Sequence, residues 1–267
     1  MERNRLDVLL VQRGLARSRA EAKELIQSGG VWINGAAVTK PAQDVPADAE
    51  IALHAERMPF VSRGGRKLEK ALRVFPIDLT GCTALDIGAS TGGFTDCMLQ
   101  SGAARVYAVD VGSDQLAPSL CSDPRVVNLE KTNIRALSPE QVPPVDFFAT
   151  DVSFISLTLV LPEAFRFLKM GGSGVCLIKP QFEVGRGRVG KNGVVRDPAL
   201  HREVVARIAD FARSMGFAVC GLDFSPIRGP EGNIEYLMYV KKGDALPCST
   251  AAADVVRDAH RAFARHD

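Results

Sequence analysis

The sequence of 267 residues lacks the features that mark several large classes of protein. Its apolar runs are far shorter than the ~18 residues needed to cross a bilayer, so we expect no membrane partner. The amino-terminal segment has no apolar stretch long enough for a secretory signal. The six cysteines form no Cys-x-x-Cys pair, which argues against a zinc or dithiol site and suits a reducing compartment. We therefore expect a cytoplasmic protein without a bound metal.

The chain also lacks a strong excess of one charge, since its formal net charge is only +2. Any surface that binds a polyanion must therefore come from a local cluster of basic residues. Such a cluster lies within residues 1–56, and it includes Arg5, Arg17, Arg19 and Lys23. A cluster of this kind can equally be a solvated helix face, so composition alone leaves both interpretations open.

Residues 1–56 are predicted to form a small module of two helices and a hairpin. Apolar residues recur at helical spacing in LDVLLVQ, and Ser18 and Glu21 form the capping pattern that starts a second helix. Asn34-Gly35 predicts a tight hairpin turn. This order, with its Arg-Leu-Asp start and its Gly-x-Val-x-Ile-Asn-Gly hairpin, resembles the S4 RNA-binding domain. The resemblance implies that the basic helices contact RNA phosphates.

Residues 63–244 change to alternating strand-like and helix-like segments. This alternation is typical of an α/β domain with a mostly parallel sheet and helices on both faces. We expect a linker, 57–62, between this domain and the small α+β module. The tail, 245–267, is predicted to carry one amphipathic helix that packs on the core.

A glycine-rich loop follows the first strand of the α/β domain, in ALDIGASTGG at 84–93. It is not a P-loop, because Phe94 stands where a lysine is needed, and its spacing fails the dinucleotide pattern. Asp110 ends the next strand, where a carboxylate can hydrogen-bond ribose hydroxyls. A ribose without a pyrophosphate indicates S-adenosylmethionine on a Rossmann-like methyltransferase domain. Asp86 would orient the loop or meet the methionine amino group.

Four charged residues lie where such a domain carries its chemistry. Asp151 and Lys179 directly follow apolar strands, Lys67 precedes the sheet, and Glu235 opens the last strand. Each alone has an ordinary structural interpretation. The motifs of base methylation, an acidic residue before Pro-Pro or a Pro-Cys pair after the middle strand, are missing from their positions. Both kinds of base methylation therefore lose ground. A ribose 2′-hydroxyl is another possible acceptor, and either lysine could take its proton if its pKa fell toward neutrality.

The segments that carry these residues resemble the TlyA family, which are S4-plus-FtsJ-like ribosomal RNA 2′-O-methyltransferases often labelled hemolysin A. The matching motifs include FVSRGGRKLEKAL, LDIGASTGGFTDCMLQSGA, DVSFISL, IKPQFEVGR and SPIRGPEGNIEY. The resemblance implies methylation of cytidine 2′-hydroxyls in large-subunit rRNA, and in some members also in small-subunit rRNA. It implies a catalytic tetrad of Lys67, Asp151, Lys179 and Glu235. Together with position along the strands, it places S-adenosylmethionine against Asp86, Gly88, Ala89, Ser90, Thr91, Gly92, Gly93, Phe94, Asp110, Asn133 and Asp151.

A second basic segment, 182–198, follows Lys179 and is predicted to be a mobile loop over bound RNA, with a plain exposed loop as the alternative. The predicted RNA contacts of this domain are Arg63, Arg66, Arg186, Arg188, Lys191 and Arg196. Phe154 is expected either to stack on a base or adenine or to belong to the core. The expected partner is ribosomal RNA or a ribosomal subunit, and the sequence indicates no oligomeric state.

Three functions of other classes are alternatives. An RNA- or ribosome-binding protein without methyl transfer predicts gaps in the tetrad, and none is present. A membrane-active hemolysin predicts a signal, a span or a cysteine framework, and the sequence has none of them. An S4-bearing pseudouridine synthase would not need the glycine-rich loop.

Overall fold

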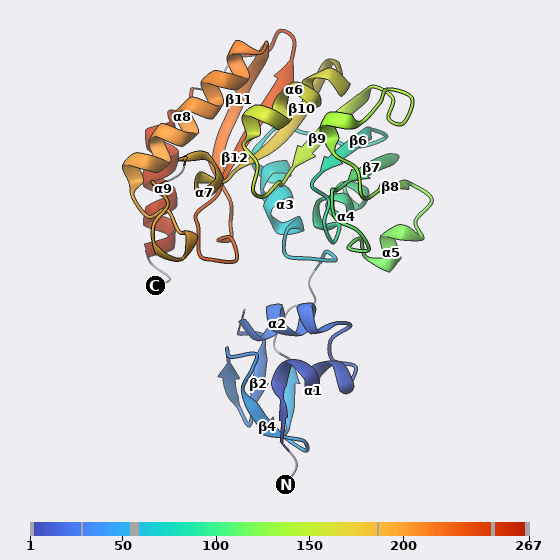
Figure 1. The fold of residues 1–267 in the computed structure, drawn as a ribbon, viewed down its shortest axis with the longest axis vertical. Coiled ribbons are helices and arrows are strands. Elements are labelled where there is room, and N and C mark those ends of the chain that lie inside the picture. Colours follow the sequence, from blue (N-terminus) through green and yellow to red (C-terminus); the bar gives the residue numbers. More distant parts are fainter. Residues whose placement is uncertain (1–2, 28, 54–58, 186, 247–248, 265–267) are drawn as a thin grey trace. The chain divides into compact units, whose positions relative to one another are not determined.

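A computed structural model describes residues 3–27, 29–53, 59–185, 187–246 and 249–264 (Figure 1). The chain divides into two compact units, Met1–Ser62 and Arg63–Asp267. Each unit closes around a hydrophobic cluster of its own. The first two residues of the predicted linker 57–62 lie outside the described part.

The first unit combines two helices with short strands. Its elements are β1(Arg3–Arg5), α1(Leu6–Gln12), α2(Arg19–Gln27), β2(Val31–Ile33), β3(Ala36–Val38), β4(Asp44–Pro46) and β5(Ile51–Leu53). The predicted turn joins β2 to β3, since Asn34 and Gly35 have φ angles of 50° and 79°. Ser18 Oγ accepts the Glu21 N–H at 3.2 Å at the start of α2. The strands β1, β4 and β5 were not predicted, because three residues are too few to show alternation.

The second unit is built on a seven-stranded sheet in the order β11-β12-β10-β9-β6-β7-β8. Its strands are β6(Thr83–Ile87), β7(Arg105–Val109), β8(Val126–Leu129), β9(Val145–Thr150), β10(Leu168–Ile178), β11(Phe217–Phe224) and β12(Tyr236–Lys242). The pairs from β10 through β8 are parallel, whereas β12 runs antiparallel to both β10 and β11. The mostly parallel α/β sheet is therefore confirmed.

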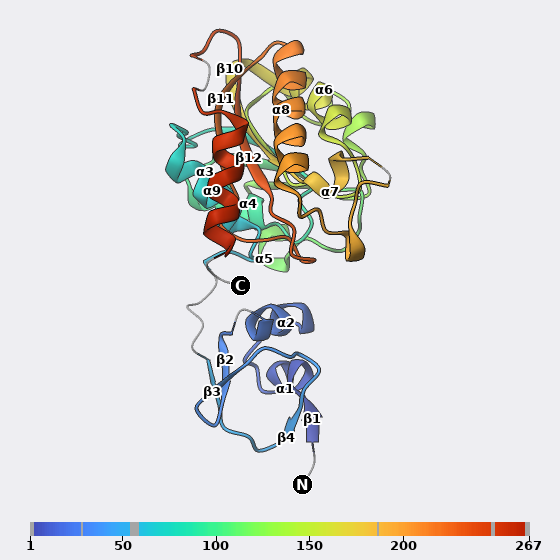
Figure 2. The same cartoon turned by 90° about the vertical axis from the view of Figure 1, so that its left-hand side faces the viewer.

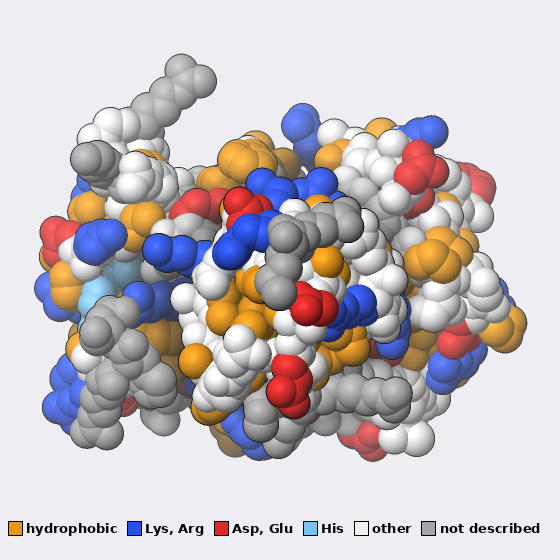
Figure 3. Space-filling view, turned by 90° about the horizontal axis from the view of Figure 1, so that it is seen from below, with side chains coloured by type: hydrophobic (Ala, Val, Ile, Leu, Met, Phe, Trp, Pro, Cys, Tyr) orange, Lys and Arg blue, Asp and Glu red, His pale blue; other side chains and the backbone are white. Residues whose placement is uncertain are grey.

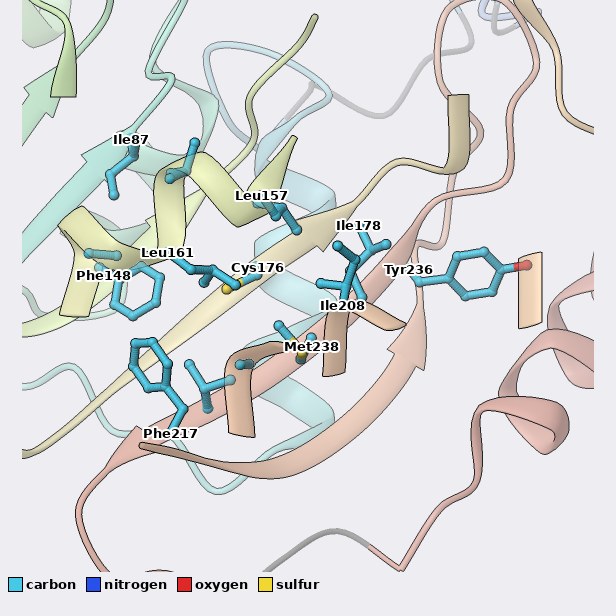
Figure 4. Packing of buried hydrophobic residues seen from close by; sticks show 14 of the residues in the cluster. Ile87, Phe148, Leu157, Leu161, Cys176, Ile178, Ile208, Phe217, Tyr236 and Met238 are labelled. Atoms are coloured by element: carbon cyan, nitrogen blue, oxygen red, sulfur yellow. The ribbon is translucent and has the colours of Figure 1, made fainter. Parts of the chain in front are cut away.

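Helices cover both faces of this sheet (Figures 1 and 2). They are α3(Gly65–Val74), α4(Gly93–Gln100), α5(Pro118–Cys121), α6(Leu157–Phe167), α7(Pro180–Glu183), α8(Pro198–Ser214) and α9(Ala252–Ala264), with short 3₁₀ turns η1(Ile134–Ala136) and η2(Lys191–Gly193). On one face, α6, α8 and α9 share an apolar cluster with alternate strand residues such as Ile87 and Met238 (Figure 4). On the other face α3 and α4 pack together, and Tyr239 stacks on Phe75 with ring centroids 5.4 Å apart.

The strand β11 was not predicted. Its sequence FAVCGLDF has a glycine in its interior and no clean alternation, which hides a strand. Gly221 lies where the pairing register with β12 shifts, and a Cβ there would lie 2.3 Å from the ring of Phe75. The ring therefore requires a glycine at this position.

The predicted helix of the tail is present as α9. Val255, Val256 and Ala259 are buried in the large cluster of the second unit, so the helix packs on the core. Among the residues described here, no helix is both long enough and apolar enough to cross a bilayer.

Candidate active site

Four charged side chains meet at the edge of the sheet where the parallel strands end. Asp151 follows β9 and Lys179 follows the neighbouring β10, so both lie at carboxyl ends. Glu235 directly precedes β12, and because that strand is antiparallel its beginning lies at the same edge. Lys67 comes from the first turn of α3. The structure therefore brings together four residues that are up to 168 positions apart, Lys67, Asp151, Lys179 and Glu235.

The four side chains form a continuous chain of ion pairs. Lys179 Nζ lies 2.5 Å from Asp151 Oδ1, and Lys67 Nζ lies 3.1 Å from Asp151 Oδ2. Lys67 Nζ also lies 2.8 Å from Glu235 Oε2. The order is Lys179, Asp151, Lys67, Glu235, so each inner residue touches two partners of opposite charge. Asp151 is thereby held between two ammonium groups.

Because the four side chains are largely buried, their ion pairs strongly affect the pKa values of Lys67 and Asp151. The Lys67 side chain is 7% exposed and that of Glu235 is 1% exposed. Burial by itself lowers the pKa of Lys67, but the Asp151 and Glu235 carboxylates outweigh it and the pKa is raised. Burial likewise favours neutral Asp151, but the Lys67 and Lys179 charges lower its pKa. The raised pKa favours a charged Lys67, which makes it less suited than Lys179 to accept a proton.

Lys179 has a different environment from Lys67. Asp151 is its carboxylate partner, and its ammonium donates to Ser153 Oγ at 3.0 Å. Its Nζ also lies 5.9 Å from the ring centre of Phe182. The side chain is 9% exposed, so the group is nearly but not completely enclosed. Ser153 was not predicted, although it lies in the motif DVSF.

Phe154, which directly follows Ser153, is on the surface and not in the core. Its side chain is 90% exposed, and its backbone takes a φ of 64°, which is unusual for a bulky residue. Its ring centre lies 4.9 Å from that of Phe182. Of the two interpretations of Phe154, the core one is therefore wrong, and a stacking surface beside Lys179 remains.

The glycine-rich loop turns between β6 and α4 close to Asp151. Gly88 has a φ of 87°, and a Cβ on it would lie 2.8 Å from the carbonyl oxygen of Asp151. Gly92 also has a positive φ, 94°. Both glycines are therefore required by backbone geometry and by close approach, since a Cβ on Gly92 would lie 2.2 Å from the Leu120 side chain. Ser90 and Thr91 are exposed at the tip, while the other predicted loop residues are buried or half-buried: Gly88, Ala89, Gly92, Gly93 and Phe94.

Asp86 is completely buried beneath the loop. Its Oδ2 accepts the Thr95 hydroxyl of α4 at 2.6 Å, while its Oδ1 is buried without a hydrogen-bond partner. Burial raises the pKa of Asp86 to about 7, although the Thr95 bond opposes the change. A buried carboxylate oxygen without a donor is costly in the free protein and is ready to receive a cationic or N–H group.

Asp110 directly follows β7, and Asn133 precedes η1 next to Thr132, whose N–H donates to the Asp110 carbonyl oxygen at 2.8 Å. Asp110 follows β7 and accepts the Ser90 N–H at 2.8 Å and the Gly112 N–H at 2.7 Å. It therefore braces the tip of the loop, and its carboxylate oxygens keep further lone pairs for other donors. Asn133 Oδ1 accepts the Arg135 N–H at 3.0 Å and caps η1, which leaves its amide nitrogen for other contacts.

The basic segment 182–198 is tied to the rest of the unit at its carboxyl end. Val195 is buried, and its N–H donates to Asn233 Oδ1 at 3.0 Å. The Val195 carbonyl oxygen lies 2.9 Å from Nε2 of the buried His201, whose Nδ1 lies 2.7 Å from the Tyr236 hydroxyl. Asn233 lies two residues before Glu235 and Tyr236 directly follows it, so these contacts link the segment to the tetrad. The contacts of Asn233, His201 and Tyr236 were not predicted, because a single buried polar residue leaves no pattern in a sequence.

The residues of the second unit that are predicted to contact RNA differ in their exposure and in their partners. Arg188 donates to Glu203 of α8 at 2.6 Å, so it is held on a helix. Arg196 is exposed, and Arg63 and Arg66 are half-buried around the start of α3. Arg186 lies outside the described residues, as does the side chain of Lys191. Figure 3 shows Lys and Arg in several small groups among Asp and Glu, as the low net charge leads one to expect.

In the first unit, a buried carboxylate gathers two of the predicted RNA contacts. Asp7 Oδ1 lies 3.0 Å from Arg5 Nε, and Asp7 Oδ2 lies 2.9 Å from Arg19 Nη2. The hydrogen bond from Arg5 is the largest of the effects that hold the pKa of Asp7 well below its usual range. Both arginines stay about half exposed, so their guanidinium groups sit side by side at the surface. Arg17 and Lys23 are exposed on the same unit.

The chain is similar to known proteins over most of its length. The family model of the FtsJ-like methyltransferase matches residues 60–242, and that of the S4 domain matches residues 4–51. The 16S/23S rRNA (cytidine-2′-O)-methyltransferase TlyA of Mycobacterium tuberculosis is 47% identical, over 90% of each chain. A Bacillus subtilis protein provisionally named as the rRNA methyltransferase YqxC is 45% identical, over 97% of this chain and 95% of its own. A solved Streptococcus thermophilus structure, provisionally named a hemolysin, has a TM-score of 0.80 at 44% identity and covers 100% of this chain and 98% of its own.

Proposed function

The chain belongs to the TlyA family of FtsJ-like methyltransferases that carry an S4 domain, and we propose that it methylates the 2′-hydroxyl of a cytidine in ribosomal RNA. The methyl donor in this proposal is S-adenosylmethionine. The arrangement of Lys67, Asp151, Lys179 and Glu235 carries the proposal. It presents two ammonium groups and one bridging carboxylate at the sheet edge where the glycine-rich loop turns.

The residues around the loop fit this cofactor. The positive φ of Gly88 and Gly92 lets the loop turn tightly between β6 and α4, with its backbone packed against Asp151 and Leu120. The buried Asp86 Oδ1 lacks a donor, which the amino group of a methionine moiety could supply. Asp110 lies at the end of β7, where its carboxylate could accept ribose hydroxyls. When bound, the cofactor would supply an electrophilic methyl group on a sulfonium.

The side chains of the tetrad would then divide the remaining chemistry. Attack by the ribose oxygen on the methyl group releases the 2′-hydroxyl proton, and that proton needs an acceptor. Lys67 is unsuitable, because its pKa is raised by two carboxylates. Lys179 is the acceptor in this proposal, with Asp151 and Ser153 fixing the position of its nitrogen. Such proton transfer typically contributes about 10²–10⁴-fold to a rate.

Lys67 and Glu235 would act by position and charge. Lys67 holds Asp151 on one side and Glu235 on the other, so it orders the carboxylate that in turn orders Lys179. Its fixed positive charge also stabilises negative charge that develops on the attacking oxygen. Holding the donor and acceptor in line could account for roughly 7–11 kcal/mol of the barrier reduction.

RNA is the substrate class that the rest of the chain supports. Arg5 and Arg19 lie side by side on Asp7 in the S4 unit, which suits contact with phosphate oxygens. Contacts of this kind give affinity with little sequence discrimination, so the choice of cytidine would rest with the second unit.

The test is methyl transfer from labelled S-adenosylmethionine to purified large and small ribosomal subunits and to naked rRNA. We expect label in RNA with the wild type and at least a 100-fold lower rate with Lys179→Ala, which removes the proton acceptor. Lys169→Ala is the matched control, because it removes a lysine that is 47% exposed from the same strand, β10.

Three results would contradict the proposal in different ways. Tight binding to RNA or subunits with no transfer to any of them would leave an RNA-binding protein. Equal loss of activity in Lys179→Ala and Lys169→Ala would remove Lys179 from the mechanism. Leakage of liposomes at protein concentrations at which RNA is not methylated would favour the membrane-active alternative.

A further inference from the structure

The loops that follow β9 and β10 are joined at several points beyond the ion pair of the tetrad. Ser153 Oγ accepts the Lys179 ammonium at 3.0 Å, and the ring centres of Phe154 and Phe182 lie 4.9 Å apart. Further along the second loop, Glu183 contacts the start of α6, where the first loop ends. The two loops are therefore connected from the tetrad as far as α6, and Glu183 makes the last of these connections.

Glu183 is a buried carboxylate at the end of α7, with a side chain that is 2% exposed. Its Oε2 accepts the Ser156 hydroxyl at 2.8 Å, and its Oε1 accepts the Leu157 N–H at 2.7 Å. The Leu157 N–H belongs to the first turn of α6, where backbone donors have no partner within the helix. Each oxygen of the carboxylate thus holds a different residue at the start of α6.

Arg207 of α8 also holds Glu183. Its Nη2 donates to the Glu183 carbonyl oxygen at 2.6 Å and lies 3.5 Å from Glu183 Oε2. The buried charge of the carboxylate is therefore compensated by one guanidinium group and two hydrogen bonds. Because both the backbone and the side chain of Glu183 are held, α7 cannot move relative to α6 or α8 without breaking one of these contacts.

An ordinary helix cap explains only part of this arrangement. Ser156 Oγ accepts the Thr158 N–H at 3.2 Å, so α6 already has a side-chain cap. A second, buried carboxylate from a separate loop adds the cost of removing a charge from water. What Glu183 adds is a connection between the loop after β9 and the loop after β10.

This connection lies close to the tetrad along both loops. Glu183 lies four residues after Lys179, and Ser156 lies five residues after Asp151. Such short stretches limit how far Lys179 and Asp151 can move apart while Glu183 and Ser156 stay joined. Catalytic groups must be held within about 0.5 Å, and a displacement of about 1 Å can cost roughly 100-fold in rate. Glu183 can therefore act on the position of Lys179 without touching it.

We propose that Glu183 is a positioning residue for methyl transfer. It sets the separation of the two loops, so that Asp151 and Ser153 hold the Lys179 nitrogen in place. The proposal rests on the proposed function, and it adds a residue that touches neither the cofactor nor the RNA. The reach of the side chain matters more than its charge, because its end must extend from α7 to the start of α6.

The test compares Glu183→Asp with Glu183→Gln in the full chain. Aspartate keeps the charge but withdraws the carboxylate by one methylene group, so it cannot hold both residues of α6. Glutamine keeps the reach, since its oxygen can accept the Leu157 N–H and its nitrogen can donate to Ser156 Oγ. Glu163→Asp is the matched control, because it shortens a glutamate of α6 that pairs with Arg166 in the same helix.

The first measurement is methyl transfer to purified ribosomal subunits. We expect kcat to fall roughly 10- to 100-fold in Glu183→Asp, and to return most of the way to the wild-type value in Glu183→Gln. Kd for the subunits should change little, because the phosphate contacts of the S4 unit are intact. The control should match the wild type in both quantities.

The second measurement is hydrogen exchange of the segment 151–157, followed by mass spectrometry. Exchange there should be faster in Glu183→Asp than in the wild type or in Glu163→Asp, because the loop has lost its connection to α7. This result reports on the loop and does not depend on catalysis.

Three outcomes would overturn the proposal. One is a kcat for Glu183→Asp equal to that of Glu163→Asp. Another is an equal loss in Glu183→Asp and Glu183→Gln, which would make the charge and not the reach the cause. The third is a loss of kcat that disappears when each variant is assayed further below its Tm, which would make Glu183 a stabilising contact only.

Failure of this proposal can be told apart from failure of the proposed function. If the wild type transfers no methyl group, the proposed function fails, and hydrogen exchange still shows whether Glu183 holds the loop. If the wild type is active and Glu183→Asp changes neither kcat nor hydrogen exchange, the positioning proposal alone fails. Faster exchange with an unchanged kcat would also refute it, because the loop would then move without consequence for catalysis.

Discussion

Replacing Lys67 with methionine should destabilise the second unit and abolish methyl transfer. Both effects should come from the loss of the same ammonium group. Methionine keeps the length of the apolar stem but removes the ammonium group between Asp151 and Glu235. Asp151 retains Lys179, whereas Glu235, whose side chain is 1% exposed, keeps a buried charge without the cation that it faced. Removing one partner of a buried ion pair typically costs about 3–5 kcal/mol.

The size of the effect can be read from thermal unfolding. For units of 150–250 residues, about 1 kcal/mol shifts Tm by about 2–4 °C, so the expected fall is about 6–20 °C. The double variant Lys67→Met/Glu235→Gln removes the uncompensated charge and should recover at least half of that loss, while staying inactive. Lys169→Met is the control and should shift Tm by less than about 3 °C, because its pair with Asp146 is on the surface. A double variant less stable than Lys67→Met would refute this reasoning.

Three further predictions concern other residues of the two units. Gly229→Ala should displace Glu235 from Lys67, since the new Cβ would lie 2.8 Å from Oε1, and should lower both kcat and Tm, measured by methyl transfer and calorimetry. Asp7→Asn makes the protein more positive, yet it should weaken rRNA binding in filter assays, because Arg5 and Arg19 lose the carboxylate that aligns them. Tighter binding of rRNA by Asp7→Asn would contradict this role of Asp7. Asp86, whose pKa is raised to about 7, should make the free protein lose stability as pH rises from about 4 to 7, because the unfolded chain releases this proton first. In Asp86→Asn that part of the pH dependence of urea unfolding should disappear.

The convergence of the tetrad could be predicted because it follows from strand order. Asp151 and Lys179 each end an apolar run, and parallel neighbours place their carboxyl ends at one edge. Glu235 joins them because it begins an antiparallel strand beside β10. What could not be predicted was the pairing within the cluster. Lys67 lies between two carboxylates that raise its pKa, which is the reverse of what a proton acceptor needs, and only side-chain positions reveal this.

Single buried polar residues were beyond the reach of sequence patterns. Asp7 carries no signal that it would join Arg5 to Arg19, since it lies two residues from the first and twelve from the second. Asn233 bonds both the Val195 N–H and the Gly193 carbonyl, which are about 40 positions away in the chain. Phe154 is apolar, and only its 90% exposure separates a surface for stacking from a core residue. Long-range packing decides each of these cases, and periodicity does not record it.

The central claim is that the methyl group goes to a ribose oxygen at the tetrad. The direct measurement is mass spectrometry of nucleosides from rRNA treated with the wild type or with Lys179→Ala in the presence of deuterated S-adenosylmethionine. The account predicts deuterated methyl on cytidine that is lost together with the ribose on fragmentation, and its absence with the variant. Deuterium that stays with the base on fragmentation would contradict the account.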